Sequence, residues 1–201
     1  MKFPYPQLEI QGIANKKVLS AIRNLPRELF VAPELQTNAY INAPLPIDCG
    51  QTISQPFIVA YMTEQLELKP TDKVLEIGTG SGFQTAVLAQ LVQEVYTIEV
   101  YPELSHKAQQ VLEKLGYKNI KYKFGDGKAG WQEFVPFDAI IITAVAKELP
   151  SLLLEQLKIG GKMILPLELD NWEQYLFLVN KTSEGKMIKR KLIEVRFVSL
   201  L

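Results

Sequence analysis

The sequence predicts an α/β fold: a Rossmann-like, doubly wound, mostly parallel sheet with a C-terminal antiparallel hairpin and an N-terminal helical extension. Three observations predict it. Apolar strand-like runs alternate with helical patterns between residues 73 and 167. A glycine-rich turn, Gly78-x-Gly80-x-Gly82, follows the first of these runs. Two later strand-like runs, at 174–179 and 187–198, have only a turn between them, which is typical of a hairpin.

The alternating part of the chain gives a definite set of elements. We expect strands at 73–78, 94–100, 119–125, 137–144 and 161–167, and helices at 82–92, 102–115 and 149–158. Strands that alternate with helices in this way form a parallel sheet with right-handed crossovers. Gly116 and the pair Gly160-Gly161 are expected to end helices, because glycine adopts the left-handed conformation at a helix C-terminus.

The N-terminal quarter is less regular. Residues 12–31 predict a helix followed by a turn, with the helix ended by Pro26. Residues 32–50 are expected to be irregular chain, and a new helix begins near Pro56 with Ser54 or Gln55 at its cap. At 201 residues the chain is expected to form one domain, with 1–55 as a helical and substrate-loop extension and 56–201 as the core.

Composition excludes several classes of function. There are 22 basic and 22 acidic residues, so no net field favours nucleic acid or an anionic membrane. No apolar run approaches the roughly 20 residues of a membrane span, and the N-terminus does not resemble a signal peptide. The single cysteine, Cys49, suits a reducing compartment, so we expect a cytoplasmic protein. With His106 as the only histidine, no metal site is expected.

The glycine-rich turn predicts a nucleotide-type site, since glycines allow a tight turn and close approach of a ligand. Glu76, two positions before Gly78, would repel a pyrophosphate but attract the sulfonium and amino group of S-adenosylmethionine. Glu99 lies 21 positions after Gly78 (99 − 78), where a ribose-hydroxyl acceptor is expected. The alternative is that both acids are ordinary strand-end charges. The glycines would also suit an NAD-dependent dehydrogenase, but Glu76 argues against that class of enzyme.

Two further features have competing interpretations. Gly125-Asp126-Gly127 ends the third strand at the same sheet edge, where Asp126 could accept a hydrogen bond from a base amino group or simply form a tight turn. His106 lies among polar residues on a predicted helix, so we expect it to be exposed rather than catalytic. No G-x-S-x-G motif is present, which argues against a serine hydrolase.

A set of motifs spread along nearly the whole chain carries a family resemblance. They are Gln11-Gly12-Ile13, Pro26-Arg27-Glu28, Leu45-Pro46-Ile47, Gly50-Gln51-Thr52-Ile53-Ser54-Gln55-Pro56, Val74 to Gln84, Gly125-Asp126-Gly127, Pro136 to Ile141 and Val195-Arg196-Phe197-Val198. The stretch Gln51 to Pro56 is the most specific of these. The chain resembles bacterial-type protein-L-isoaspartate O-methyltransferases, within the S-adenosylmethionine-dependent methyltransferase superfamily.

The resemblance implies a function and a set of site residues. The family methylates the free α-carboxylate of L-isoaspartyl residues in damaged proteins, which starts their repair through a succinimide. Ser54 would be the active-site serine and, with Ile53, Val195, Arg196, Phe197 and Val198, would bind the substrate. The cofactor, S-adenosylmethionine, would be bound by Gln51, Thr52, Ile53, Glu76, Gly78, Thr79, Gly80, Ser81, Gly82, Glu99, Val100, Asp126 and Gly127. The expected partner is therefore an isoaspartyl-containing protein or peptide, and the enzyme is expected to be a monomer.

Three segments depart from the usual family pattern: Asp48-Cys49 occupies the place of a glycine-rich turn, Ala144-Val145-Ala146-Lys147 stands where the family favours Ala-Ala-Pro, and Ser199 replaces a usual proline. The sequence thus leaves two alternatives open. One is a methyltransferase of the same fold with another carboxylate or a small molecule as its acceptor. The other is a catalytically silent protein that binds S-adenosylmethionine.

Overall fold

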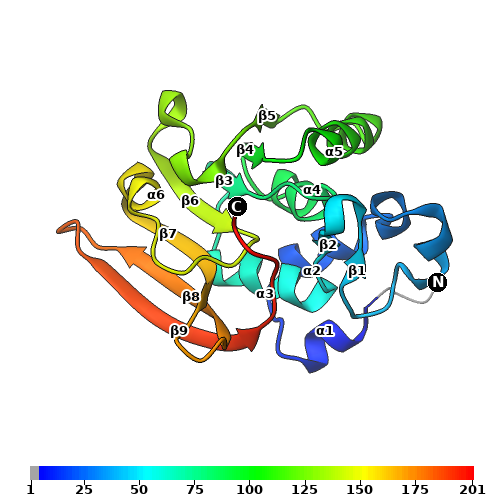
Figure 1. Ribbon diagram of the computed structural model, residues 1–201, viewed down its shortest axis with the longest axis horizontal. Coiled ribbons are helices and arrows are strands. Elements are labelled where there is room, and N and C mark those ends of the chain that lie inside the picture. The colour runs from blue at the N-terminus through cyan, green and yellow to red at the C-terminus, as the bar shows by residue number, and fades with distance from the viewer. Residues whose placement is uncertain (1–4) are drawn as a thin grey trace.

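A seven-stranded sheet organises the protein, with strand order β5-β4-β3-β6-β7-β8-β9 (Figure 1). The computed structural model describes residues 5–201, so the first four residues of the predicted extension lie outside the described part. The strands are β3 (Lys73–Ile77), β4 (Glu94–Glu99), β5 (Ile120–Phe124), β6 (Phe137–Ile142), β7 (Leu157–Glu168), β8 (Gln174–Lys181) and β9 (Met187–Val195). Strands β3 to β7 pair in parallel, and β8 and β9 are antiparallel additions. The predicted fold class is confirmed.

The helices are α1 (Gln7–Ile10), α2 (Lys16–Arg23), α3 (Pro56–Leu66), α4 (Phe83–Ala89), α5 (Pro102–Lys114) and α6 (Ser151–Gln156). Of these, α3 to α6 pack against the sheet, on both of its faces. On β3, Val74 faces a core shared with α3 and α4, whereas Leu75 and Ile77 face a core shared with α6. This alternation follows from the two-residue period of a strand, and it leaves Glu76 on the same face as Val74.

The N-terminal extension packs against α4 and α5 rather than directly on the sheet. Its buried residues, including Val18, Leu19, Ile22 and Phe30, form one core with Phe83 and Leu112. As predicted, a helix precedes Pro26, although α2 already ends at Arg23 and a 3₁₀ turn follows at Arg27–Phe30. Asn15 caps α2 by accepting hydrogen bonds from the backbone N–H groups of Lys17 and Val18. The extension packs on α3 as well as on α4 and α5.

The irregular chain predicted at 32–50 contains more structure than expected. Two 3₁₀ turns, Pro33–Asn38 and Asp48–Gly50, flank a two-residue strand, β1 (Leu45–Pro46). Strand β1 pairs with β2 (Thr52–Ile53), so the specific segment around Ser54 is part of a small two-stranded sheet. Strands this short carry no detectable period in the sequence.

The helix predicted at 149–158 and the strand predicted at 161–167 are both present, but the predicted boundary between them is wrong. Helix α6 ends at Gln156, and β7 begins at Leu157, so Gly160 and Gly161 lie inside a strand instead of ending a helix. The pairing of β6 with β7 jumps from Phe137↔Leu157 to Ala139↔Lys162, which marks a bulge. A β-carbon on Gly161 would lie 2.8 Å from the carbonyl oxygens of Asp138 and Lys158, so glycine is required there by close approach.

The C-terminal end of the chain also differs from the prediction in one respect. The predicted hairpin is present, but β9 ends at Val195, so Arg196, Phe197 and Val198 do not continue the strand. Instead the tail turns back over the sheet, where Val145 N–H donates to the Val198 carbonyl at 2.8 Å and Leu200 N–H donates to the Val145 carbonyl at 2.9 Å. Figure 1 shows this tail ending near the middle of the sheet edge.

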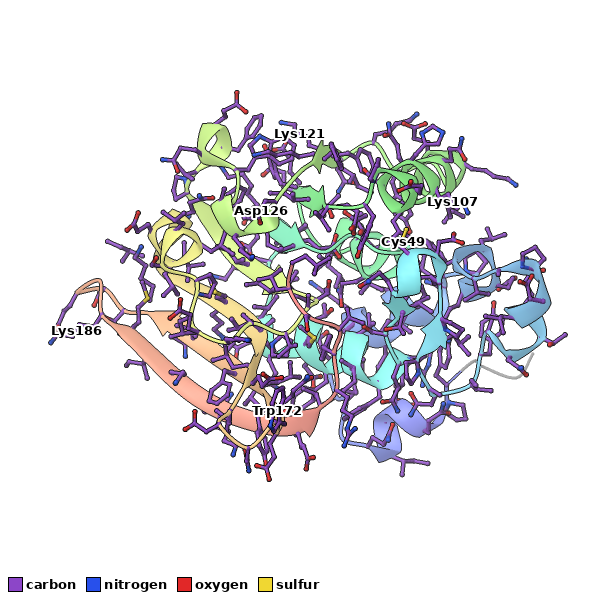
Figure 2. The ribbon with its side chains drawn as sticks, viewed as in Figure 1. Cys49, Lys107, Lys121, Asp126, Trp172 and Lys186 are labelled. Atoms are coloured by element: carbon purple, nitrogen blue, oxygen red, sulfur yellow. The ribbon has the colours of Figure 1, made fainter. Side chains whose placement is uncertain are left out.

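Both outer strands of the sheet carry basic side chains. On β5, the ammonium groups of Lys121 and Lys123 lie over the rings of Tyr96 and Trp131 at 4.8 and 5.6 Å. On β9, those of Lys189 and Lys191 lie over the rings of Phe177 and Tyr175 at 4.9 and 3.3 Å. Figure 2 shows Lys121 at the top of the molecule and Lys186, in the β8–β9 turn, at its left-hand end.

Candidate active site

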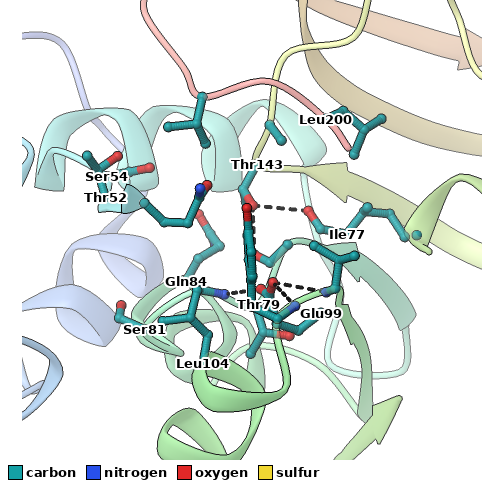
Figure 3. A pocket seen from close by; sticks show the side chains of 18 of the residues that line it. Thr52, Ser54, Ile77, Thr79, Ser81, Gln84, Glu99, Leu104, Thr143 and Leu200 are labelled. Carbon is teal, nitrogen blue, oxygen red and sulfur yellow. Dashed lines mark hydrogen bonds between the residues drawn. The ribbon is translucent and has the colours of Figure 1, made fainter. Parts of the chain in front are cut away.

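A pocket opens at the carboxyl ends of β3 and β6, where the strand order reverses. Strands β4 and β5 extend from one side of β3, whereas β6 and β7 continue on the other, so crossovers leave in opposite directions from this point. Ligands of open α/β sheets bind at such a switch point. Figure 3 shows Ser54 and Thr52 on one side of the pocket and Glu99 on another.

Most of the residues predicted for the site line this pocket. They are Gln51, Thr52, Ile53, Ser54, Gly78, Thr79, Gly80, Ser81, Glu99, Val100, Gly127 and Val198. These residues come from five separated parts of the chain: the β2 segment, the turn after β3, the end of β4, the turn after β5 and the C-terminal tail. The fold therefore brings together motifs that are distant in the sequence.

The glycine-rich turn is fixed by hydrogen bonds to neighbouring strands. The N–H of Gly78 donates to the Ile98 carbonyl at 2.9 Å, and the hydroxyl of Thr143 donates to the Gly78 carbonyl at 2.7 Å. Gly78, Gly80 and Gly82 have φ values of +93°, +54° and +88°, which explains why the turn requires glycine. Gly82 itself points away from the pocket, toward Ala108 and Leu112 of α5.

Glu99 is held at the end of β4 by three backbone amides. One oxygen accepts from Gly80 N–H at 2.8 Å, and the other accepts from Val100 and Tyr101 N–H at 2.9 and 3.1 Å. The carboxylate is only 5% exposed, yet it lines the pocket. These contacts fix its orientation, while the oxygen that accepts only from Gly80 retains a lone pair that could accept from a ligand hydroxyl.

Glu76 lies beneath the pocket rather than in its lining. Its side chain is fully buried, and one oxygen accepts from the hydroxyls of Thr85 and Thr97 at 2.6 and 2.7 Å. The other oxygen has no hydrogen-bond partner within residues 5–201. Burial raises the pKa of this carboxyl to about 8, against the two threonine bonds that lower it. At neutral pH Glu76 is therefore mainly a neutral acid, not the anion assumed when its attraction for a sulfonium was predicted.

The threonines connect Glu76 to the turn above it. The hydroxyl of Thr97 is within 2.6 Å of the Thr79 hydroxyl, and Thr79 lines the pocket. A chain of side-chain hydrogen bonds thus runs from the buried acid to the loop. The influence of Glu76 on a ligand in the pocket passes through this loop.

Four other predicted site residues, Asp126, Val195, Arg196 and Phe197, lie outside the pocket lining. Asp126 caps a 3₁₀ turn by accepting from Lys128 N–H at 2.8 Å, in keeping with the tight-turn alternative. Val195 is buried at the end of β9, and Arg196 and Phe197 precede the tail. Phe197 N–H donates to the Gln174 side-chain oxygen at 2.6 Å, which anchors the segment that leads to Val198.

Ser54 presents an uncommitted hydroxyl. The N-cap of α3 is Gln55, with Pro56 in the first turn, and no side chain caps that helix end. No hydrogen bond to the Ser54 hydroxyl is found within residues 5–201, although its backbone carbonyl accepts one from Arg27. The hydroxyl is therefore available to a ligand, and the capping interpretation of Ser54 is not supported.

Several lining residues were not predicted, among them Gln84, Leu104, Thr143, Leu200 and Leu201. Thr143 follows β6 at the same sheet edge as Glu99, so its position after the fourth expected strand was the available signal. The tail residues gave no comparable signal, because their place depends on a backbone pairing with Val145.

The lone histidine and possible metal ligands can also be placed. His106 is on the exposed side of α5, where its Nε2 lies 2.9 Å from the Gln110 amide nitrogen. Among residues 5–201 no group of three or more His, Cys, Asp or Glu side chains is arranged to hold a metal ion. No helix in that range is both long enough and apolar enough to cross a membrane.

Comparisons with known proteins agree over almost the entire chain. The model of the protein-L-isoaspartate(D-aspartate) O-methyltransferase family matches residues 5–201. A protein-L-isoaspartate O-methyltransferase of Picosynechococcus sp. is 50% identical over 194 residues, covering 96% of this chain and 86% of that protein. The enzyme of the same description from Dictyoglomus turgidum is 51% identical over 193 residues, covering 96% and 87%.

Solved structures give the same answer. A structure described as a Plasmodium falciparum enzyme of this kind, in complex with S-adenosyl-L-homocysteine, has a TM-score of 0.86 at 28% identity, covering 97% of this chain and 95% of that one. Another protein-L-isoaspartate O-methyltransferase has a TM-score of 0.86 at 30% identity, and this chain, matched over 96% of its length, spans 63% of that longer chain. The chain therefore belongs to the protein-L-isoaspartate(D-aspartate) O-methyltransferase family, whose activity is S-adenosylmethionine-dependent methylation of isoaspartyl residues in proteins.

Proposed function

We propose that the pocket at the ends of β3 and β6 binds S-adenosylmethionine and an isoaspartyl residue side by side, with Ser54 orienting the acceptor. The main support for this proposal is that Ser54, whose hydroxyl is free, lines the same pocket as Glu99 and the glycine-rich turn. The family's cofactor supplies an activated methyl group on a sulfonium. The remaining task of the protein is to hold an acceptor oxygen in line with that group and to exclude water.

The pocket residues fit this cofactor. Gly78 to Gly82 leave the backbone of the turn open for the methionine portion, because no β-carbon projects from the three glycines. The fixed carboxylate of Glu99 suits a ribose hydroxyl, and Val100 beside it adds apolar contact. Gly127, with Asp126 next to it, suits the adenine end. Gln51, Thr52 and Ile53 would close the cofactor site from the side of the extension, and Glu76 would support it from below.

The acceptor needs no general base. A peptide α-carboxylate has an ordinary pKa near 3.5 and is ionised at neutral pH, so its oxygen is already nucleophilic. On this proposal Ser54 donates a hydrogen bond to one carboxylate oxygen and leaves the other free to attack. Ile53 and Val198 would contact the isoaspartyl residue, while Val195, Arg196 and Phe197 would frame the client's backbone. His106, exposed on α5, takes no part.

We further propose an oligomeric state, a cellular compartment and a class of partner for the protein. On this proposal the protein acts as a monomer in the cytoplasm on other proteins, without binding nucleic acid or membrane. The equal numbers of basic and acidic residues support the lack of nucleic-acid and membrane binding, and the exposed thiol of Cys49 supports a reducing compartment. Residues 1–55 would serve as the extension that shapes the acceptor side of the site. Residues 56–201 would form the cofactor-binding core.

The direct test is transfer of a labelled methyl group to a peptide that contains isoaspartate and to its aspartate twin. The expected result is alkali-labile label in the isoaspartyl peptide alone. Transfer to neither peptide by a protein that binds S-adenosylhomocysteine would contradict the proposal and favour a silent binding protein.

The role of Ser54 has its own test. Ser54→Ala should lower kcat for the isoaspartyl peptide by about tenfold, because a hydrogen bond to a charged group contributes about 1.5–3 kcal/mol. Cofactor affinity, measured by calorimetry, should remain near wild type. Ser183→Ala, in the exposed β8–β9 turn, is the matched control. Unchanged kcat in Ser54→Ala would remove Ser54 from the mechanism.

A further inference from the structure

Arg27 is a buried cation without an acidic partner. Its side chain is fully buried in the 3₁₀ turn that follows Pro26. The ion pairs found within residues 5–201 do not include it, although Arg23 nearby pairs with Glu9. Fully buried arginines are rare unless paired, because removing the charge from water is costly. An unpaired, fully buried arginine therefore indicates a structural or functional role.

The guanidinium is held by backbone carbonyls from two separate segments. One terminal nitrogen donates to the carbonyls of Ala39 and Ile41, and the other donates to those of Ala43 and Ser54 at 3.3 and 3.0 Å. The planar fork of arginine allows these simultaneous bonds, and a lysine ammonium at the same place could not reproduce them. Arg27 therefore fixes the backbone of Ser54 against the chain at 39–43.

Arg27 also contacts the cofactor side of the site. Its guanidinium carbon lies 5.5 Å from the centre of the Phe83 ring, within the range of a cation–π contact. Phe83 is the first residue of α4, directly after the glycine-rich turn, and it lines the pocket. A single side chain thus joins the segment that carries Ser54 to the helix that begins at the cofactor turn.

The positive charge of Arg27 is important for a carboxylate acceptor because, within residues 5–201, no basic side chain lines the pocket itself. Among the described residues that line it there is no lysine, arginine or histidine, whereas Glu99 contributes an acid. The acceptor is a carboxylate, so it needs a positive field or strong donors. Arginine stays protonated at neutral pH even where burial lowers its pKa, as it does here. Because the guanidinium is buried, solvent and salt screen its field weakly.

We propose that Arg27 is the positioning residue of the acceptor site: it holds the Ser54 backbone in place and supplies positive potential behind the position of the isoaspartyl carboxylate. This rests on the acceptor role proposed above for Ser54. Arg27 does not touch the substrate, and it acts through Ser54 and Phe83. The substitution Asp48-Cys49 in the neighbouring turn leaves these contacts intact.

The test compares Arg27→Lys, which keeps the charge, with Arg27→Met, which removes it. In both, kcat/KM for the isoaspartyl peptide should fall by about tenfold to hundredfold, since hydrogen bonds to a charged group are lost. The loss should be larger in Arg27→Met, where KM for the peptide should also rise. Affinity for S-adenosylhomocysteine should stay within about threefold, and circular dichroism should report a folded protein.

Two controls separate this proposal from others. Arg23→Lys, which alters the surface pair with Glu9, should leave both cofactor affinity and kcat/KM unchanged. Ser54→Ala is measured in the same assay. If Ser54→Ala is impaired and Arg27→Lys is not, the Arg27 proposal fails alone; if Ser54→Ala is unimpaired, the underlying function of Ser54 fails. A parallel loss of folding or cofactor binding in both Arg27 variants would also overturn it, by making Arg27 a general structural residue.

Discussion

The carboxylate of Glu99 accepts a hydrogen bond from the backbone N–H of Gly80 at 2.8 Å. This bond joins the end of β4 to the glycine-rich turn after β3, two segments that are 19 residues apart in sequence. A residue predicted as a ribose acceptor therefore also organises the loop that would hold the other half of the same cofactor.

Removing this carboxylate should weaken cofactor binding in two ways: the ribose contact is lost, and the glycine-rich turn loses the hydrogen bond that holds it. We expect Glu99→Ala to raise the Kd for S-adenosylhomocysteine by about tenfold or more, since hydrogen bonds to a charged group contribute about 1.5–3 kcal/mol. Calorimetric titration measures it. Glu103→Gln, an exposed acid in the first turn of α5, is the control and should bind normally. An unaltered Kd in Glu99→Ala would contradict the ribose role.

Glu76 should make stability depend on pH in a predictable direction. Its ordinary pKa is 4.5 in the unfolded chain, and burial raises it to about 8 in the folded protein. Between these values the folded state binds more protons than the unfolded state, so the stabilisation is complete below pH 4.5 and is lost as the pH rises through 8. Glu76→Gln keeps an oxygen that can accept from Thr85 and Thr97 but does not titrate.

The measurement is urea unfolding of wild type and Glu76→Gln at several pH values between 5 and 9. We expect the free energy of unfolding of the wild type to fall relative to that of the variant as pH rises across this window. Glu184→Gln, in the β8–β9 turn, controls for loss of a surface acid. Parallel pH curves for wild type and Glu76→Gln would show that Glu76 is ionised in the folded protein.

A methyl group at position 78 should be costly for two separate reasons. The residue has a φ of +93°, and a β-carbon there would overlap the Thr143 hydroxyl, which holds the Gly78 carbonyl. Gly116→Ala meets only the first problem, because its φ is +86° but the space around it is open. That control should lose about 1–2 kcal/mol from backbone strain.

Gly78→Ala should lose about 1–3 kcal/mol more than Gly116→Ala because of the overlap. Its affinity for S-adenosylhomocysteine should also fall, while Gly116→Ala binds normally. Denaturant titration and calorimetry measure the two effects. Equal stabilities for the two variants would mean that Thr143 moves aside without cost.

Asp48 forms an ion pair with Lys107 at 2.7 Å, which directs its charge toward α5. Lys107→Gln leaves Asp48 uncompensated near the acceptor side, so the KM for an anionic isoaspartyl peptide should rise by roughly threefold at low salt. Adding Asp48→Asn should restore it. In about 1 M sodium chloride the effect should vanish, because exposed charges are screened. A rise in KM that persists in the double variant would assign it to Lys107 itself.

The sequence allowed the central strands and the cofactor turn to be predicted because their signals are local. Apolar runs such as Val74 to Ile77 and alternating glycines report a buried strand and a tight turn without knowledge of the rest of the chain. The prediction that Gly160-Gly161 ends a helix failed for the same reason, because it used only local information. Glycine ends helices, but it also permits close backbone approach, and only the contact with Asp138 distinguishes the two.

The remaining features depend on contacts between distant segments. Burial of Glu76 against Thr85 and Thr97 turns an expected anion into a neutral acid, and no local pattern indicates that outcome. Arg27 belonged to a recognisable motif, but its use became visible only when the carbonyl of Ser54 was placed beside it. The tail at Val198 likewise reaches the pocket through pairing with Val145.

The lysines of the two outer strands have a consequence for an enzyme whose clients are damaged proteins. Such clients expose unpaired backbone, which readily adds to an open sheet edge. On β5 and β9 the ammonium groups of Lys121, Lys123, Lys189 and Lys191 lie across aromatic rings next to those edges. Charged groups there discourage an extra strand from annealing, so the protein can handle partly unfolded chains without becoming a template for their aggregation.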